Sequence, residues 1–297
     1  MANKEVKVYK TEKLIPYLFV APQILGFILF MVIPIVYLLY LCFNDWNFTS
    51  APKYTGLDNF KFVLSDPIFI KSIANTFVLS VSVVPLTLII SLCLALLCNK
   101  RMAGLGFYKS AFFLPMVTST VSIAMVFYWI YAPDVGLMHF LLSFFKIQNP
   151  NWFTETFWAR MAVTIMVSWL QTGYYFVIFV SGLKAISSSY YEAAEIDGAN
   201  SFQKFRKITW PMLSPVTFFA TVTLLIYSIN VFNEPFILTG GGPDFMTYTL
   251  SMYVYHYAFQ SFKYGPAAVA STVLFIILAA VTLIQFGLQR KLVNYDA

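Results

Sequence analysis

Three long apolar segments are interrupted by side chains that could bind a sugar. Amide groups donate and accept hydrogen bonds from sugar hydroxyls, and aromatic rings cover the apolar faces of a sugar ring. Residues three or four apart share one face of a helix, so Gln171 with Tyr174 or Tyr175, and Tyr227 with Asn230, are expected to point the same way. The residues that we expect to line a solute path are Tyr128, Trp129, Gln171, Tyr174, Tyr175, Tyr227, Asn230 and Asn233. The alternative is that they pack or form interhelical hydrogen bonds, worth about 0.6 kcal/mol each.

Other kinds of chemistry have little support in the sequence. The three cysteines, Cys42, Cys93 and Cys98, lie in or at the ends of apolar segments, with no metal-ligand spacing, and are expected to be small buried hydrophobes. The only histidines are His139 and His256, and no His/Glu, Asp/Asp or Ser/His/Asp cluster accompanies them. We therefore expect no catalytic residue, no metal site and no cofactor, and a membrane-embedded enzyme is disfavoured.

The stretch from Ser189 to Ala199 predicts a short capped helix. Ser189 followed by Glu192 has the spacing of a capping box, in which side chains satisfy free backbone donors at a helix start. Gly198 stands where a left-handed C-terminal cap favours glycine. Asn200 and Gln203 can begin a second helix, whose apolar stripe is formed by Phe202, Phe205 and Ile208. The pattern alone also fits an amphipathic loop that lies on the bilayer without a partner.

The elements that carry these residues are expected to be membrane helices. The chain has 297 residues, of which 59% are hydrophobic and 11% charged, and a soluble domain of this length cannot bury so much apolar surface. Six segments reach the roughly 20 apolar residues that a span needs: about 14–43, 72–98, 108–131, 158–184, 213–237 and 266–288. Proline residues predict bends in the first three.

The distribution of cations predicts the orientation. Of the 19 Lys and Arg residues, 13 fall in one set of flanks, and cytoplasmic flanks carry the excess. Both termini are therefore expected in the cytoplasm, with tails at 1–13 and 289–297, a transmembrane domain at 14–288 and a cytoplasmic loop at 185–212. The cations form no basic stripe, so nucleic-acid binding is not expected.

Glu192, Ala193 and Ala194, followed by Asp197, Gly198 and Ala199, resemble the conserved loop of binding-protein-dependent ABC importer permeases. Phe205, Ile208, Pro211 and Pro215 continue this resemblance, and Trp210 departs from it where the family usually has Leu. The segment from Asn233 to Pro243, Phe112 to Pro115, and Gly265 to Ala268 resemble the maltose-type sugar permeases, here in a compact six-span form.

This resemblance implies an all-α, type I importer permease fold with six transmembrane helices and a cytoplasmic coupling helix. The residues implied to contact an ATPase are Tyr191, Glu192, Ala193, Ala194, Asp197, Gly198, Ala199 and Phe205. The implied partners are a second homologous permease in a heterodimer, two copies of a cytoplasmic ATPase subunit and an extracytoplasmic solute-binding protein. ATP hydrolysis would then occur in the partner ATPase, and this chain would be no enzyme.

The nature of the solute is left open at this stage. A di- or oligosaccharide is favoured, and another small solute such as glycerol phosphate is the alternative, although an anion would need Arg or Lys in the path. An ion- or proton-coupled carrier is disfavoured, because such carriers usually need ionisable residues inside their spans, and Lys109, Arg160, Lys184 and Glu234 all fall near predicted span ends.

Overall fold

The computed structural model describes residues 10–98 and 104–293. Parts of the predicted tails 1–13 and 289–297 lie outside these described residues, as do Lys4, Lys7, Lys100 and Arg101 of the charge analysis. Within the described part the chain is almost wholly helical, and its only strands are β1 (Asn44–Asp45) and β2 (Lys53–Tyr54), which pair antiparallel. The predicted all-α class is therefore confirmed.

The helices follow one another with short connections. In chain order they are α1 (Lys10–Phe27), α2 (Ile33–Leu41), α3 (Asp58–Ser65), α4 (Pro67–Cys98), α5 (Leu105–Val117), α6 (Thr120–Ile130), α7 (Leu137–Phe144), α8 (Thr156–Ala185), α9 (Ser188–Ile196), α10 (Ser201–Lys204), α11 (Trp210–Met212), α12 (Ser214–Ile229), α13 (Asn233–Leu238), α14 (Leu250–Tyr255) and α15 (Tyr264–Leu292). Three π-helical turns, η1 (Ile28–Val32), η2 (Phe205–Thr209) and η3 (His256–Gln260), are inserted among them.

The described part holds four helices long and apolar enough to cross a membrane, or six if two bent pairs each form one span. The bent pairs are Gly106–Val117 with Thr120–Ile130, at 97°, and Ser201–Met212 with Ser214–Ile229, at 62°. Pro115 alone predicted a milder kink in the third span. The chain breaks further because Thr118 takes an extended conformation, and its hydroxyl bonds the carbonyl of Leu114 at 2.9 Å.

The predicted fifth span, 213–237, is too long at its C-terminal end. Helix α12 stops at Ile229, where Asn230 caps it by donating from its side chain to the carbonyl of Ile226 at 2.9 Å. The apolar residues that follow belong to the separate helix α13. The predicted span ran on to residue 237 because α13 is also partly buried and its sequence is therefore also apolar.

Two of the π turns stand two residues before a proline. Turn η1 precedes Pro34 and turn η2 precedes Pro211. Proline cannot donate to the fourth residue before it, and its ring clashes with that carbonyl in a regular helix. A wider turn relieves the clash without ending the helix, and such turns are common where a helix bends.

Helix α8 forms the centre of the bundle. Of its most apolar stretch, 72% is buried, whereas for the span Pro16–Leu41 the share is only 6%. Helices α4, α5 and α12 pack against α8. At Gly173 the backbones of α8 and α5 touch, since a Cβ there would stand 1.8 Å from the carbonyl oxygen of Phe112. No other residue type fits at this crossing without moving a helix.

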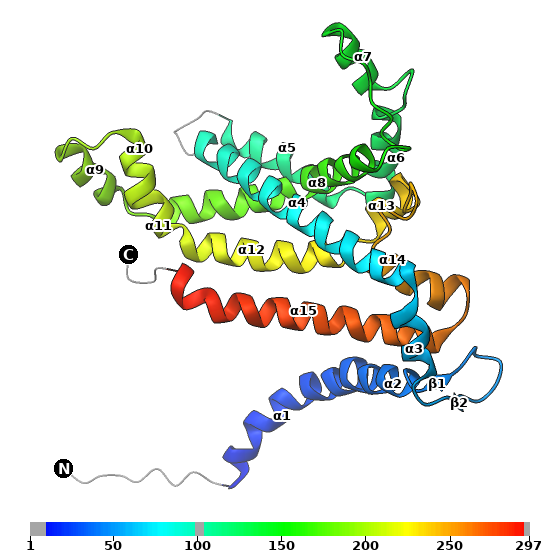
Figure 1. Ribbon diagram of the computed structural model, residues 1–297. Coiled ribbons are helices and arrows are strands. Elements are labelled where there is room, and N and C mark those ends of the chain that lie inside the picture. The colour runs from blue at the N-terminus through cyan, green and yellow to red at the C-terminus, as the bar shows by residue number, and fades with distance from the viewer. Residues whose placement is uncertain (1–9, 99–103, 294–297) are drawn as a thin grey trace, which may run out of the picture.

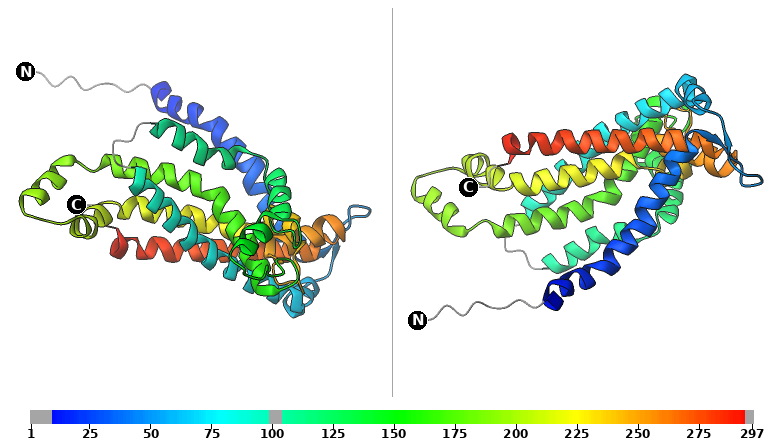
Figure 2. Two further views of the ribbon diagram at one scale, coloured as in Figure 1. Left: turned by 90° about the horizontal axis from the view of Figure 1, so that it is seen from above. Right: turned by 90° about the horizontal axis from the view of Figure 1, so that it is seen from below.

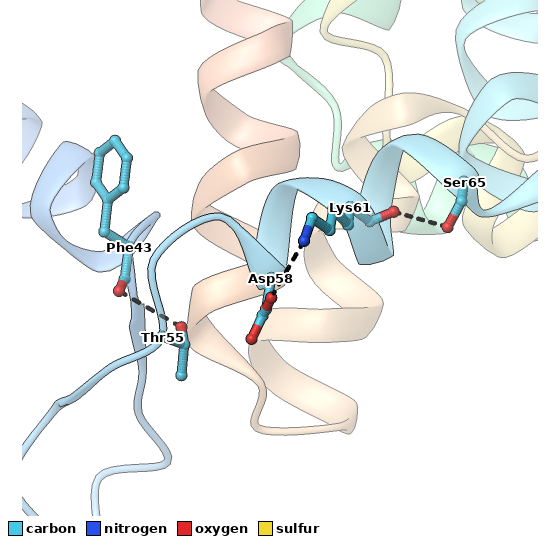
Figure 3. A network of polar contacts seen from close by, with 5 residues as sticks. All are labelled: Phe43, Thr55, Asp58, Lys61 and Ser65. Atoms are coloured by element: carbon cyan, nitrogen blue, oxygen red, sulfur yellow. Dashed lines mark hydrogen bonds and ion pairs between the residues drawn. The ribbon is translucent and has the colours of Figure 1, made fainter.

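The bundle has two distinct ends (Figures 1 and 2). Helices α9 and α10 form one end, and the described ends of α1 and α15 point toward it. Helices α3, α13 and α14 and the β1–β2 hairpin form the other end. In Figure 3 the hairpin joins α3 through Thr55, whose hydroxyl bonds the carbonyl of Phe43 at 3.4 Å, while Asp58 and Lys61 form an exposed ion pair at 3.9 Å.

Candidate functional site

The loop between α8 and α12 begins with a serine cap, two residues earlier than predicted. Helix α9 starts at Ser188, and its N-cap is Ser187, whose hydroxyl accepts a hydrogen bond from the backbone of Ser189 at 3.4 Å. The predicted capping box of Ser189 with Glu192 is therefore wrong, because Ser189 already lies inside the first turn. Its hydroxyl lies 2.8 Å from that of Ser187 instead, and the carboxylate of Glu192 is exposed.

The turn after α9 is a Schellman motif, as the position of Gly198 predicted. Gly198 has φ +76. Its N–H donates to the carbonyl of Glu195 at 3.0 Å, and the N–H of Ala199 donates to that of Ala194 at 2.8 Å. These two bonds satisfy carbonyls that a helix end otherwise leaves free.

The second arm of the loop begins with the predicted Asn200 cap. The side chain of Asn200 accepts from the backbone of Gln203 at 2.9 Å, and the side chain of Gln203 accepts from the backbone of Asn200 at 2.8 Å. This is a complete capping box. It fixes the direction in which α10, η2 and α11 return toward α12.

Two side-chain contacts hold the arms together. The ammonium of Lys204 lies 2.6 Å from the carboxylate of Glu195, and the hydroxyls of Tyr191 and Thr209 lie 2.9 Å apart. Thr209 is buried, and Tyr191 packs against the main hydrophobic core. The loop is thus a defined hairpin of helices, anchored at its base.

The tip of this hairpin faces away from the bundle (Figure 1). Ile196 is 88% exposed and Phe202 is 68% exposed. Of the predicted ATPase-contact residues, Glu192, Ala193, Asp197 and Gly198 are exposed, whereas Tyr191, Ala194, Ala199 and Phe205 are half-buried. Exposed apolar side chains beside small residues and carboxylates make a surface that another protein can cover.

A polar cluster joins α8, α12 and α13. The hydroxyl of Tyr227 donates to the carboxylate of Glu234 at 2.7 Å, and Gln171 also hydrogen bonds to Tyr227. The hydroxyl of Tyr175 donates to Thr223 at 3.3 Å. The structure therefore brings together three of the predicted path residues, Gln171, Tyr175 and Tyr227.

The other predicted path residues lie around or away from this cluster. Tyr174 is half-buried and stands edge-on to Tyr175, with ring centroids 5.1 Å apart. Asn230 and Asn233 are exposed at the α12–α13 connection. Tyr128 and Trp129 are 53% and 58% exposed on α6, and Tyr128 stacks on Phe153.

The sequence interpretation missed Glu234 and Thr223 as members of the cluster. Glu234 is near a helix end, as predicted, but its side chain is buried, with 3% exposed. Its position in the first turn of α13 favours a carboxylate, because helix N-termini carry partial positive charge. Glu234 follows Tyr227 by seven residues, and this spacing was the only signal in the sequence that the two side chains could meet. They meet because the helix breaks at Asn230, which the sequence did not predict.

A second polar network fixes the glycine-rich loop that follows α13. Arg160 donates to the carbonyl of Met246 at 2.9 Å and to the side chain of Asn75 at 2.7 Å. Asn75 in turn donates to the carbonyls of Phe245 and Tyr248 at 2.6 and 3.0 Å. The loop that begins at Gly240 is therefore held firmly against α4 and α8. Among the described residues, no group of three His, Cys, Asp or Glu side chains is placed to hold a metal ion.

These observations describe a helical membrane protein with an exposed, capped helix hairpin at one end, which another protein can engage, and a buried polar cluster inside the bundle. The comparisons agree: residues 92–294 match the family described as the binding-protein-dependent transport system inner membrane component. The chain belongs to this family. It is a multi-pass membrane permease of the ABC importer class and not an enzyme, as the sequence predicted.

Relatives of known name cover almost the whole chain. It is 35% identical to the probable ABC transporter permease protein YesP of Bacillus subtilis, over 100% of this chain and 97% of the relative. It is 34% identical to the lactose transport system permease protein LacF of Rhizobium radiobacter, over 93% and 94%. It is 33% identical to the sn-glycerol-3-phosphate transport system permease protein UgpA of Agrobacterium fabrum, over 96% and 97%.

A solved structure shares the fold. A chain of a bacterial alginate ABC transporter, in complex with an alginate pentasaccharide-bound periplasmic protein, superposes with a TM-score of 0.81 at 22% identity, covering 95% of this chain and 96% of that chain. At this identity the likeness establishes the importer permease fold.

Proposed function

We propose that this chain forms one half of the translocation path for a neutral sugar, a di- or oligosaccharide, in an ATP-driven importer. A second homologous permease supplies the other half, two ATPase subunits dock on the cytoplasmic side, and a solute-binding protein delivers the sugar from outside. The proposal is carried by two observations together. Gln171, Tyr175 and Tyr227 form one polar cluster, and the chain belongs to the binding-protein-dependent permeases.

The hairpin of α9 and α10 is proposed to be the contact with the ATPase. Its capped helix ends and the two side-chain contacts between its arms give it a defined shape. Its tip exposes Ile196 beside small and acidic residues. Since hydrolysis occurs in another subunit, its motion must reach the spans through a contact of this kind. The exposed carboxylate of Glu192 is available for a basic or amide group of the partner.

The proposed orientation places this hairpin and both termini in the cytoplasm. The excess of Lys and Arg in these flanks supports it, and so does the arrangement in Figures 1 and 2, where α1 begins and α15 ends toward the α9 end. Reporter fusions in the 44–70 loop and after residue 291 test it. Finding the two positions on the same face would contradict it.

A neutral sugar suits the cluster better than an anion. Its five side chains, Gln171, Tyr175, Thr223, Tyr227 and Glu234, include one carboxylate and no cation. A buried carboxylate repels an approaching phosphate, because Coulomb forces are strong where water is excluded. One relative is named for lactose and another for glycerol phosphate. The cluster therefore favours a neutral sugar such as lactose over glycerol phosphate. Glycerol phosphate is kept as the second candidate because that relative is nearly as similar.

The decisive experiment is uptake by the complete importer in proteoliposomes, after the cognate binding protein has been screened for its ligand. Alanine at Gln171, Tyr174, Tyr227 or Asn230 should reduce uptake about ten-fold or more, as loss of one or two hydrogen bonds to solute implies. The ATPase should still co-purify. Tyr108→Ala, at an exposed position near the start of α5, is the matched control. Normal uptake by all four variants would contradict the path assignment.

A further inference from the structure

A cavity of about 270 Å³ lies beside α14, apart from the polar cluster. It is partly open and is lined by residues at the start of α4, in α13, in the glycine-rich loop, and in α14 with η3. At roughly 30 Å³ for each water molecule, the space corresponds to a ligand of one ring rather than a long chain. It is close to the lower limit of small-molecule sites, about 300 Å³.

Aromatic rings from three segments form most of the wall. Phe236 stands edge-on to Tyr255, with centroids 5.4 Å apart, and Phe245 stands edge-on to Tyr248 at 5.4 Å. Tyr253 and Tyr257 lie 4.6 Å apart on the third side. The three pairs are inclined at 68°, 89° and 43°, so the wall presents flat apolar faces in several directions.

The polar groups of the wall are held in place by neighbouring atoms. Asp66 caps α4 by accepting from the backbone of Ile68 at 2.9 Å, and accepts from the hydroxyls of Tyr253 and Tyr257 at 2.8 and 3.3 Å. Burial, and then the hydrogen bond to Asp66, raise the pKa of Tyr253 above its ordinary value, so this hydroxyl stays protonated and remains a donor. His256 and Gln260 are joined at 2.8 Å.

This wall excludes ions and favours a neutral ligand. The carboxylate of Asp66 repels anions, and because three donors already meet its charge, it is not poised to hold a cation. A rigid aromatic surface with hydroxyl, imidazole and amide groups along its edge matches the two kinds of surface on a pyranose ring, its apolar face and its hydroxyl rim.

We propose that this cavity is a second sugar site, which holds one ring of a neutral saccharide at the outer end of the permease before the sugar enters the path. The inference rests on the proposed sugar specificity and adds a place where the permease itself contacts the sugar outside the spans. Because Asp66 orders Tyr253 and Tyr257, the site exists before the ligand arrives.

The test is sugar binding to the full permease pair with its ATPase subunits in nanodiscs, without the binding protein. The probes are methyl β-D-glucopyranoside, maltose and lactose, with sn-glycerol 3-phosphate as the anionic probe, and the readout is saturation-transfer NMR. At least one neutral probe should give a signal, and Tyr255→Ala should weaken its binding about five-fold, the range expected for one aromatic contact. Glycerol 3-phosphate should give none.

The matched control is Phe259→Ala, one turn beyond Tyr255, with ring centroids 5.4 Å apart and 63% of the side chain exposed. It should bind as the unaltered protein does. Gln260→Ala, at an exposed position, is the second cavity variant and keeps the test independent of folding. Equal effects of Tyr255→Ala and Phe259→Ala on probe binding, or no signal from any neutral probe, would overturn the proposal.

The same experiment separates this inference from the proposed function. Sugar uptake by the complete importer together with no effect of the cavity variants on probe binding would remove the second site and leave the transport function intact. If Tyr255→Ala weakened a clear saturation-transfer signal but the importer transported no sugar, the sugar-binding cavity would stand and the proposed transport function would be refuted.

Discussion

Replacement of Gly198 tests the role of the α9–α10 hairpin directly. With φ +76, this residue is in the left-handed region, which costs a residue with a side chain about 1–2 kcal/mol, a factor of roughly 5 to 30 in the equilibrium between the native turn and other turns. A Cβ at this position would meet nothing within 4 Å. The cost is therefore conformational and not steric.

A graded series follows from this. Gly198→Asn should be the mildest change, since asparagine tolerates the left-handed region, Gly198→Ala should be intermediate, and Gly198→Val the most severe. Because a partner binds only the fraction of molecules with the native turn, its apparent affinity falls with that fraction. The assay is the amount of ATPase that co-purifies with the permease at several concentrations, followed by ATP-dependent uptake in proteoliposomes.

The control is Gly287→Ala in α15, where a Cβ also meets nothing within 4 Å and φ lies outside the left-handed region. It should bind the ATPase normally. If Gly198→Val bound the ATPase and supported uptake like the unaltered protein, the hairpin would not be the coupling contact. Equal damage from asparagine and valine at Gly198 would show that backbone conformation is not the cause.

Three further outcomes are expected. Glu195→Gln should lower the free energy of unfolding by less than about 1 kcal/mol, because its pair with Lys204 is largely exposed on the Glu195 side, and the difference in melting temperature from the unaltered protein should be smaller at high salt than at low salt. Gly173→Ala should cost about 1–3 kcal/mol, since its Cβ would overlap the carbonyl oxygen of Phe112; an unchanged melting temperature in detergent would contradict this helix crossing. Arg160→Ala leaves acceptors without their donor, at about 1–3 kcal/mol, and should speed hydrogen exchange in residues 240–249 while leaving α8 protected.

Local patterns in the sequence predicted those features that depend on a few neighbouring residues. Gly198 and the Asn200–Gln203 cap were found because each needs only its own turn of chain. The start of α9 was misplaced because residues 187, 188 and 189 are all serine, and any of them can cap. The choice is made by Ile186, which is buried and so sets where the chain leaves the core.

Features that depend on distant segments were harder to predict. The contact of Tyr227 with Glu234 requires the chain to break at Asn230, whereas hydropathy suggested an unbroken span. The tie from Arg160 to Met246 joins residues 86 apart in the chain, and no periodic pattern records such a pair. Tyr128 was grouped with the path by residue type alone, and its place there stays a prediction.

The hydrogen bond between the hydroxyls of Tyr191 and Thr209 joins the first arm of the hairpin directly to the end of its second arm. Thr209 lies just before α11 and α12, so this bond joins α9 to the start of α12 by a shorter route than the chain that runs through α10. Under the proposed coupling role, a partner that pushes on the tip would therefore act on α12, the helix that carries Tyr227.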